Sequence, residues 1–329
     1  MKALVTGALG YIGQGVVRSL HRRDIEVFAV VRTGSDITPI RDSVKEVIFW
    51  DLASEGSPEA IPEDIGCIYH LAAATQGSHF EMMMNTVVAT DNLMRALADK
   101  KVGRFVLVSS FSVYKMTSLK RGSVLDETCP IEDRLVARDS YSNTKVRQEA
   151  LVKKICAQRG LPLVIVRPGK IYGPTTYPIP PQMGLNIPGI CYLYIGGRSV
   201  LPLTHVANCA EAIVLAGLAK GIEGDTFNIV DDDLPTQGQF VRLYRRHLGS
   251  FPTRIWVPYG MFRLMALIYE YVSRKTKGNL PPLISRYRAD NLWKSLKYTN
   301  RNAKEKLHWA PQKATGEGLV EMFESVRDK

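Results

Sequence analysis

Three residues of this 329-residue chain could move a proton to or from an oxygen atom. Tyr141 and Lys145 stand four positions apart, which places a phenol and an ammonium on one face of a helix. A free phenol has a pKa of about 10, so only about 0.1% of it is ionised at pH 7. An ammonium about 4 Å away, at an effective dielectric constant of about 20, favours the phenolate by about 4 kcal/mol and brings that pKa close to neutrality. Ser110 ends an apolar run and offers a hydroxyl to an oxygen on which charge develops.

These residue types suit a reaction in which a hydride enters or leaves a carbonyl carbon while its oxygen gains or loses a proton. By itself, a tyrosine four residues before a lysine is common and usually structural. The pair indicates a catalytic role only when the same chain also has a site for a hydride carrier and a serine at the end of a strand. The interpretation of Tyr141 and Lys145 therefore depends on the segments that precede them.

The first twenty residues predict a strand, a tight turn and a helix. Residues 2–6 form a short apolar run, Gly7, Gly10 and Gly13 follow at intervals of three, and apolar residues then recur at helical spacing. Such a turn lets backbone N–H groups face a pyrophosphate, and the helix N-terminus adds partial positive charge. We therefore predict a dinucleotide site here, and an ordinary strand-to-helix turn built from small residues is the alternative.

The end of the second predicted strand, residues 25–31, indicates which dinucleotide binds. An acidic residue at this place would hold the ribose hydroxyls of NAD. This chain instead has Arg32, Thr33 and Ser35. A guanidinium and two hydroxyls suit a 2′-phosphate, because arginine grips phosphate oxygens in a fork. The sequence thus favours NADP(H), while NAD(H) remains an alternative in which Arg32 stacks on the adenine.

Further apolar runs alternate with helical patterns along the chain. Strands are expected at 44–50, 67–74, 104–108, 163–166 and 226–230, and helices at 80–98 and 140–158. This alternation predicts an α/β fold with a doubly wound parallel sheet of the Rossmann type. Asn208, with Glu211 three residues later, reads as the N-cap of another helix.

The composition changes at Pro174, where a proline-rich apolar segment begins. We expect this segment to shape a substrate site. The predicted division assigns residues 1–173 and 204–230 to a dinucleotide-binding domain. It assigns residues 174–203 and 231–329 to a smaller C-terminal substrate-binding region.

Composition limits the partners of the chain. The net charge is +11, with basic residues densest between 274 and 306, but no nucleic-acid-binding motif accompanies them. We expect a solvated basic face or attraction of anionic ligands, and no nucleic-acid partner. The five cysteines are scattered without a CxxC pair, so neither a disulfide framework nor a metal site is expected. With no secretory signal before the first strand, a reducing, cytoplasmic setting is predicted.

Residues 256–272 are strongly apolar, with one face formed by positions 261, 264, 265, 268 and 272. The stretch is too short to span a bilayer, and Arg263 and Glu270 interrupt it. A packed helix is the favoured prediction. The basic residues that follow leave peripheral membrane contact as a less favoured alternative.

Taken together, these motifs resemble the extended short-chain dehydrogenase/reductase family, the NAD(P)-dependent epimerase/dehydratase-like group. The likeness covers nearly the whole chain and rests on a TGxxGxxG turn at 6–13, Asp-Leu at 51–52, His-Leu-Ala-Ala at 70–73, YxxxK at 141–145 and an RPxxxYGP segment at 167–174. The resemblance implies Ser110, Tyr141 and Lys145 as catalytic residues. It implies the following cofactor contacts, with Arg32 added from its strand-end position: Gly7, Gly10, Tyr11, Ile12, Gly13, Arg32, Asp51, Leu52, Leu71, Ala72, Ala73, Tyr141, Lys145, Pro168 and Ile171. It also implies a homodimer formed through the helices near 80–98 and 140–158.

Departures from the family pattern narrow the expected reaction. Family dehydratases carry an Asp-Glu pair where this chain has Phe111 and Ser112, so the general acid and base for elimination are missing. Family sugar-nucleotide epimerases place an arginine shortly before the His-Val element, and here only Arg198 is near it. The apolar insert looks closer to hydroxysteroid-dehydrogenase-like and carbonyl-reductase members.

We therefore expect an NAD(P)-dependent oxidoreductase acting on a carbonyl or secondary alcohol of a rather apolar substrate, with Tyr141 as acid/base. The alternatives are an NAD-dependent sugar-nucleotide epimerase, which needs the same three residues, and a non-catalytic cofactor-sensing protein.

Overall fold

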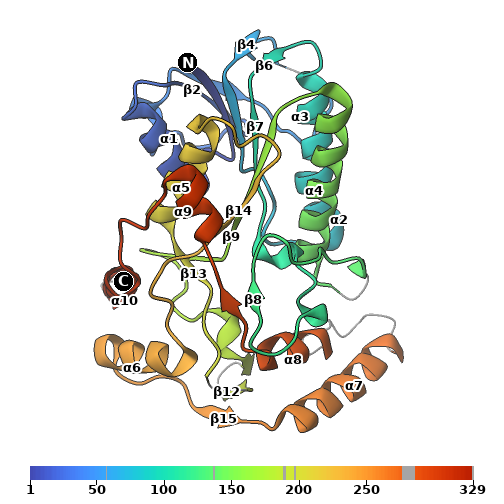
Figure 1. The fold of residues 1–329 in the computed structure, drawn as a ribbon, viewed down its shortest axis with the longest axis vertical. Helices are drawn as coiled ribbons and strands as arrows, with labels where there is room; N and C mark the ends of the chain where they lie inside the picture. The colour runs from blue at the N-terminus through green and yellow to red at the C-terminus, as the bar shows by residue number, and fades with distance from the viewer. Residues whose placement is uncertain (57, 136–137, 188–189, 196–197, 276–285, 328–329) are drawn as a thin grey trace.

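The computed structural model describes residues 1–56, 58–135, 138–187, 190–195, 198–275 and 286–327. Its centre is a seven-stranded sheet in which every neighbouring pair of strands is parallel (Figure 1). The strand order is β14-β9-β7-β5-β1-β2-β3. The strands are β1 (Lys2–Thr6), β2 (Glu26–Val31), β3 (Glu46–Phe49), β5 (Cys67–His70), β7 (Phe105–Val108), β9 (Leu163–Pro168) and β14 (Thr226–Ile229). The predicted doubly wound parallel sheet is confirmed.

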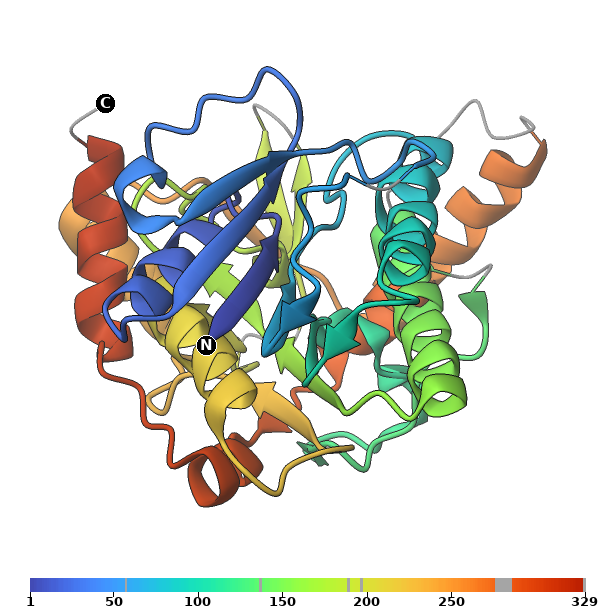
Figure 2. The same cartoon turned by 90° about the horizontal axis from the view of Figure 1, so that it is seen from above.

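Each face of this sheet is covered by helices, as the view from above shows (Figure 2). Along β1, Ala3 and Val5 join one hydrophobic core and Leu4 joins the other, as expected for a strand buried on both faces. The first core packs beneath α1 (Gly13–His21) and α5 (Val206–Leu218). The second packs beneath α3 (Ala89–Ala96) and α4 (Ser140–Arg159), and α2 (His79–Met83) contacts α4.

The helix expected over residues 80–98 is present but interrupted. A π-helical turn, Met84–Val88, separates α2 from α3. Such turns are rare and frequently occur at functional sites. Here Thr86 and Thr90 are both fully buried, while Asn85 reaches Arg32 at the end of β2.

A smaller region lies at the carboxyl end of the large sheet, at the bottom of Figure 1. Its extended elements are β10 (Lys170–Tyr172) with β13 (Leu203–His205), and a three-stranded sheet of β11 (Leu185–Ile187), β12 (Cys191–Tyr194) and β15 (Arg254–Trp256). Its helices are α6 (Gln237–Leu248), α7 (Tyr259–Lys275) and α8 (Arg286–Trp293). Many apolar side chains of residues 174–203, such as Met183 and Leu185, form cores within this region, so much of the apolar character of that segment serves packing.

The C-terminal part of the chain, which the sequence assigned to the smaller region, packs on both regions. Ala303 and Leu307 of α9 (Arg301–Leu307), and Trp309 after it, join the core beneath α1 and α5. In contrast, Leu319 and Phe323 of α10 (Thr315–Arg327) pack with α6. The final segment therefore ties the two regions together.

Short strands and 3₁₀ turns connect these larger elements in the described residues. Two-residue strand pairs join β4 (Asp64–Ile65) to β6 (Lys101–Val102), and β8 (Val124–Leu125) to β16 (Lys297–Tyr298). Single 3₁₀ turns occur at Arg41–Ser43, Phe111–Val113, Met116–Ser118 and Pro181–Met183. Of the helices in the described ranges, none combines the length and apolarity needed to cross a membrane.

Candidate active site

The glycine turn lies between β1 and α1, beside the end of β5. Gly7 has φ +68°, and a Cβ there would lie 2.9 Å from the backbone nitrogen of Ala72. A Cβ on Gly13 would lie 2.1 Å from the Gly7 carbonyl oxygen. The sheet order reverses here, because β2 follows β1 on one side and β5 lies on the other. In open parallel sheets a dinucleotide binds at such a switch point, so the position of the glycine turn fits the predicted dinucleotide.

The first turn of α1 can receive a pyrophosphate. Tyr11, Ile12 and Gly13 precede the first hydrogen bonds within α1, so their N–H groups lack helical acceptors. No acidic residue lies in this first turn to compete for them. The Tyr11 hydroxyl donates to the Pro174 carbonyl oxygen at 2.7 Å, which ties the turn to the start of the smaller region. Burial, helped by the charge of Glu321, raises the pKa of Tyr11 to about 12, so this tether stays neutral.

Two alanine substitutions should separate phosphate binding from folding. A Cβ on Gly10 meets only the Gly7 carbonyl oxygen, at 3.0 Å, so we expect Gly10→Ala to cost about 1 kcal/mol or less while its methyl obstructs the phosphates. Gly13→Ala should cost about 1–3 kcal/mol because its Cβ overlaps the backbone. Melting curves with and without dinucleotide measure both effects. Gly316→Ala, with open space around its Cβ, is the control. A ligand-induced shift in Gly10→Ala as large as in wild type would contradict the assignment.

The expected adenine side of the site is formed by the ends of β2 and β3. Arg32 donates from Nη2 to Asn85 Oδ1 at 2.7 Å, which holds the guanidinium beside the π-helical turn. Asp51 accepts from the backbone nitrogen of Ala53 at 3.1 Å. Asn92 of α3, which sequence reasoning missed, donates to the carbonyl oxygen of Leu52 at 2.9 Å. Asn92 thereby fixes the turn that is expected to contact adenine.

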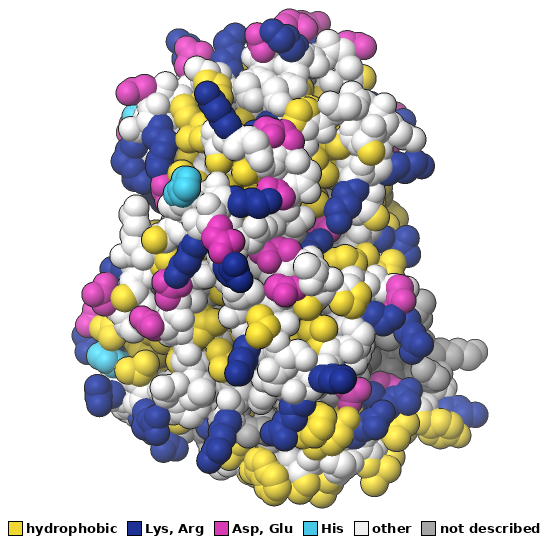
Figure 3. Space-filling view, viewed as in Figure 1, with side chains coloured by type: hydrophobic (Ala, Val, Ile, Leu, Met, Phe, Trp, Pro, Cys, Tyr) yellow, Lys and Arg dark blue, Asp and Glu magenta, His cyan; other side chains and the backbone are white. Residues whose placement is uncertain are grey.

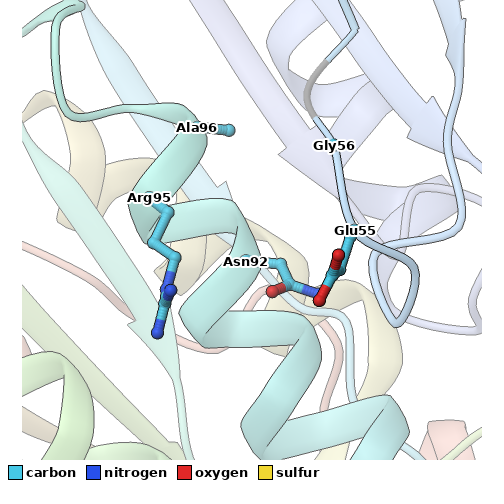
Figure 4. A pocket seen from close by; sticks show the side chains of 5 residues that line it. All are labelled: Glu55, Gly56, Asn92, Arg95 and Ala96. Carbon is cyan, nitrogen blue, oxygen red and sulfur yellow. The ribbon is translucent and has the colours of Figure 1, made fainter.

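An open hollow of about 470 Å³ adjoins this turn. It lies between α3 and the loop after β3 and is lined by Glu55, Gly56, Asn92, Arg95 and Ala96 (Figure 4). None of these residues belongs to the predicted site, and Arg95 is paired with Asp91 on its own helix. The hollow is therefore separate from the residues expected to do chemistry.

Ser110 and Tyr141 come together at the carboxyl end of the sheet. Ser110 follows β7, caps a 3₁₀ turn, and accepts from the backbone nitrogen of Ser112 at 3.1 Å. Tyr141 lies in the first turn of α4, which Asp139 caps through the backbone nitrogen of Ser142 at 2.9 Å. Burial raises the pKa of the Tyr141 phenol, a side-chain hydrogen bond with Ser110 lowers it, and the charge of Asp139 raises it again. The net pKa is above the ordinary value of 10.0, so the phenol is protonated at neutral pH.

Lys145 lies one turn after Tyr141, but its ammonium does not have the effect expected from the sequence. Its Nζ donates to the Val108 carbonyl oxygen and to Gln148 Oε1, each at 2.8 Å. Burial lowers the pKa of Lys145 to about 7, although the charge of Glu149 acts in the opposite direction. A partly charged lysine, held by these acceptors, leaves the pKa of Tyr141 raised instead of lowered.

A buried chain of hydrogen bonds links Lys145 to the glycine turn. Gln148 Nε2 donates to Thr90 Oγ1 at 2.9 Å, and His70 Nε2 lies 2.8 Å from the same hydroxyl. Because the Thr90 hydroxyl donates its proton to the Thr86 carbonyl oxygen, it accepts from His70, which therefore carries its proton on Nε2. His70 Nδ1 then accepts from the Thr6 hydroxyl at 2.7 Å. Burial, followed by the charge of Lys145, lowers the pKa of His70 to about 3, so the ring is neutral.

The buried Lys145 predicts a specific dependence of stability on pH. Between about pH 7 and 10.5 the unfolded chain binds a proton here that the folded chain has lost. The free energy of unfolding should therefore rise with pH across that window, by at most about 1.4 kcal/mol per pH unit. Lys145→Met abolishes this gain. Its Tm relative to wild type should fall as the pH is raised from about 6 to about 9. Lys154→Met, on the exposed side of α4, is the control, and a difference that stays constant with pH would contradict the prediction.

A second network of buried hydrogen bonds joins α4 to the central sheet. Glu149 accepts from Arg167 Nε at 3.1 Å and from the Ser109 hydroxyl at 2.8 Å. Arg167 Nη1 donates to the Tyr114 hydroxyl at 2.9 Å, which in turn donates to Asn228 at 2.7 Å. Sequence reasoning assigned no role to Gln148 or Glu149. Their positions three and four after Lys145 are the signal that could have found them, since such residues share its helix face.

The remaining predicted cofactor residues follow the ends of central strands. Leu71, Ala72 and Ala73 come directly after β5, and the Ala72 nitrogen donates to Thr6 Oγ1 at 3.3 Å. Pro168 ends β9 opposite Ile229 of β14, and Ile171 lies in β10. The structure therefore brings the ends of β5 and β9 to the same edge of the central sheet as Ser110, while β10 belongs to a separate two-stranded sheet.

Asn208 is not the N-cap that the sequence indicated. His205 takes that place and accepts from the backbone nitrogen of Ala207 at 3.3 Å. The Asn208 amide is buried inside α5 and donates to Asp231 at 2.9 Å and to the Lys313 carbonyl oxygen at 2.8 Å. Its role is to join α5 to the end of β14 and to the C-terminal segment, contacts that local sequence cannot reveal.

Comparison with known proteins agrees with this arrangement. The chain matches the model of the NAD dependent epimerase/dehydratase family over residues 3–229. It is 28% identical over 283 residues to sterol demethylase protein B of Methylococcus capsulatus, covering 84% of this chain and 83% of that protein. It is 30% identical over 240 residues to the 4-hydroxy-2-methyl-3-oxo-4-farnesyl-3,4-dihydroquinoline-1-oxide ketoreductase of Stigmatella aurantiaca, covering 70% and 68%.

A solved structure, UDP-glucuronic acid 4-epimerase from Bacillus cereus in complex with NAD, shares the fold. Its TM-score is 0.72 at 19% identity, over 100% of this chain and 97% of that one. The match to the family covers the glycine turn, the end of β7 and the whole of α4. The chain therefore belongs to the NAD dependent epimerase/dehydratase family and is an extended short-chain dehydrogenase/reductase.

Proposed function

We propose that this enzyme is a carbonyl reductase that transfers hydride from NADPH to the ketone of an apolar substrate, in a reversible reaction. Membership of a family of nicotinamide-dependent epimerases, dehydratases and reductases limits the chemistry to this range. The observation that carries the proposal is the Tyr141 phenol, which shares a hydrogen bond with Ser110 and has a raised pKa. A phenol that is protonated at neutral pH is ready to act as the general acid that carbonyl reduction needs.

Each residue of the trio has a distinct proposed role. When bound, the nicotinamide supplies the hydride. Tyr141 gives its proton to the substrate oxygen, and Ser110 orients that oxygen through its hydroxyl. Lys145, fixed by Val108 and Gln148, would hold the nicotinamide ribose when the cofactor is bound, and its ammonium would stabilise the phenolate left on Tyr141. That phenolate regains its proton from solvent, which closes the proton balance.

The residues after Ser110 support reduction over elimination. Phe111 is 4% exposed and stacks on Tyr298 with ring centroids 5.8 Å apart. The hydroxyl of Ser112 is buried. Dehydration needs an acid and a base at these two positions, and neither side chain can supply them.

The apolar substrate class is supported by the relatives. Their names describe a sterol demethylase protein and a ketoreductase of a farnesyl-bearing compound. The B. cereus enzyme, a UDP-sugar epimerase, is related at 19% identity and supports only the fold. The preference for NADP(H) rests on Arg32, because an arginine held beside the end of β2 suits a 2′-phosphate.

The test is direct measurement of turnover by the purified chain. NADPH oxidation is followed with a panel of apolar cyclic and long-chain ketones, and UDP-glucose and UDP-glucuronic acid are supplied in parallel with NAD. We expect stoichiometric NADPH loss with at least one ketone class. Epimerised UDP-sugar without net change in the cofactor would establish the epimerase alternative. Tight cofactor binding without turnover in either arm would establish the cofactor-sensing alternative.

Arg32 provides a separate prediction about the cofactor. Losing a charged hydrogen bond to the 2′-phosphate costs about 1.5–3 kcal/mol, so Arg32→Ser should weaken NADP(H) binding roughly 10- to 150-fold. NAD(H) binding should change less than about threefold. Titration calorimetry measures both, and Arg41→Ser, an exposed arginine of the following 3₁₀ turn, is the control. Equal losses for the two cofactors would show that Arg32 stacks on adenine, and the NADP preference would then be wrong.

The homodimer stays a prediction. The helices expected to form it, α2 with α3 and α4, lie side by side on one face of the sheet (Figure 2). Sedimentation equilibrium of the wild type, and of a variant with Phe80 of α2 replaced by Asp, would test whether this face associates.

A further inference from the structure

The smaller region has a solvent-exposed apolar surface. Six large side chains of β15 and α7 are each 43–64% exposed: Trp256, Met261, Leu264, Leu267, Ile268 and Tyr271. On α7 these positions recur at intervals of three and four, so they form a single stripe. Together they expose on the order of several hundred Å² of apolar surface, an amount typical of interaction sites. We call this stripe the α7 apolar face.

The opposite side of α7 explains why the stripe points outward. Phe262 and Ala266 are fully buried, and Phe262 belongs to the core that β11 and β12 share. Tyr259, at the start of the helix, stacks on Trp293 with ring centroids 4.4 Å apart. One side of α7 therefore packs against the rest of the protein. The α7 apolar face lies on a different side of the helix, which is exposed to solvent. The sequence predicted a packed helix, but packing against the protein leaves several of the large apolar residues of α7 exposed.

The surroundings of this face are basic. Residues 251–275 contain four basic residues and one acidic residue. The acidic one, Glu270, is paired with Arg286 at 2.9 Å. Arg263 is half exposed and lies 3.7 Å from Asp290. Lys275 is exposed, with its Nζ 5.7 Å from the centre of the Tyr271 ring. Figure 3 shows yellow and dark blue side chains mixed along this lower edge of the molecule.

We propose that the α7 apolar face docks on the surface of an anionic lipid membrane. An amphipathic helix with aromatic and aliphatic residues on one side and cations beside it lies in the plane of such a surface. Trp256 and Tyr271 are the residue types that favour the headgroup level, because each joins an apolar ring to a polar tip. α7 is 17 residues long, or about 25 Å, and lies along the edge of the molecule (Figure 1), so it can rest on the bilayer.

Charge favours the membrane over a second copy of the chain. A two-fold contact through this face would bring Arg263 and Lys275 close to the same residues of the other copy, and like charges in a contact are unfavourable. Anionic lipid headgroups attract these two cations, and each basic residue near such a surface strengthens binding. The proposal does not depend on the reaction, but a docked enzyme would lie where apolar substrates accumulate.

The experiment is vesicle binding by the full purified chain. Vesicles of phosphatidylcholine with about 30% phosphatidylserine are compared with phosphatidylcholine alone. We expect sedimentation with the anionic vesicles and at least about tenfold weaker partitioning to the neutral ones. The double variant Leu264→Ser with Ile268→Ser should lower partitioning to anionic vesicles about tenfold or more. Arg263→Glu with Lys275→Glu should lower it similarly, and only for anionic vesicles.

Val124→Ser is the matched control, because Val124 is 48% exposed on β8 and lies outside both the α7 apolar face and the predicted dimer face. It should bind vesicles like the wild type. All of these substitutions are at exposed positions, and unchanged melting curves verify that the variants fold. Wild type that fails to bind anionic vesicles, or a serine variant that binds as wild type does, would overturn the proposal. Loss of a dimer in the serine variant, with no vesicle binding by wild type, would assign the face to a second copy instead. Either result leaves the ketone assay unaffected. Failure of the membrane-docking proposal can therefore be distinguished from failure of the proposed reductase function.

Discussion

Replacing Tyr141 by Phe is expected to lower kcat by about 10²- to 10⁴-fold while leaving the Kd for the cofactor within about threefold of wild type. The substitution removes only the hydroxyl whose proton the proposed reaction moves, and it keeps the ring at the start of α4. The predicted dinucleotide-binding turn of Gly7, Gly10 and Gly13 lies on other elements and is untouched. Single-turnover measurement of NADPH oxidation, with the cofactor titrated separately, distinguishes the two effects.

The pH profile gives this prediction a second readout. Because the pKa of Tyr141 is raised, wild-type reduction should not lose rate through ionisation of the phenol anywhere near neutral pH. Ser110→Ala serves as a comparison, since it removes the hydrogen bond that lowers this pKa, and it should reduce kcat while raising the pKa further. Full activity in Tyr141→Phe would show that another group is the acid, and the proposed mechanism would be abandoned.

The second large effect concerns stability. Glu149→Ala is expected to cost about 3–5 kcal/mol, because it leaves the buried guanidinium of Arg167 without its carboxylate. Both side chains are 3% exposed, and Arg167 also donates to Tyr114. Burial on its own raises the pKa of Glu149, but hydrogen bonds and charge from Arg167 and Lys153 outweigh it, and the pKa lies below its ordinary value. Chemical denaturation followed by circular dichroism measures the loss.

The sign of the pH effect follows from that lowered pKa. The contribution of Glu149 is present above the unfolded-state pKa of 4.5 and is lost as the pH falls through the lower folded-state value. The difference between wild type and Glu149→Ala should therefore shrink in acid. Glu305→Ala breaks an exposed pair with Arg301 and should cost far less stability than Glu149→Ala, which makes it the matched control. A double variant, Glu149→Leu with Arg167→Met, should recover much of the loss, and no recovery would contradict the unpaired-charge explanation.

Much of this protein follows from short stretches of sequence. Glycines at 7, 10 and 13 act through their own backbone, so the spacing alone predicts the turn, and the structure places it at the switch point of the sheet. The alternation of apolar runs with helical patterns is also local, and it correctly predicted the parallel sheet and its flanking helices. Tyr141 and Lys145 share a helix face because helical geometry requires it.

What only the tertiary structure decided is the environment of those residues. Whether Lys145 carries charge depends on its burial and on the acceptors Val108 and Gln148, which lie on a strand and on the same helix. Asn208 looks like a helix cap until Asp231 and Lys313 are seen to bind its amide. Hydropathy likewise showed that α7 is amphipathic but not that one apolar side remains in water. Burial and long-range partners set pKa values and surfaces, and they arise only when distant segments meet, so local sequence cannot specify them.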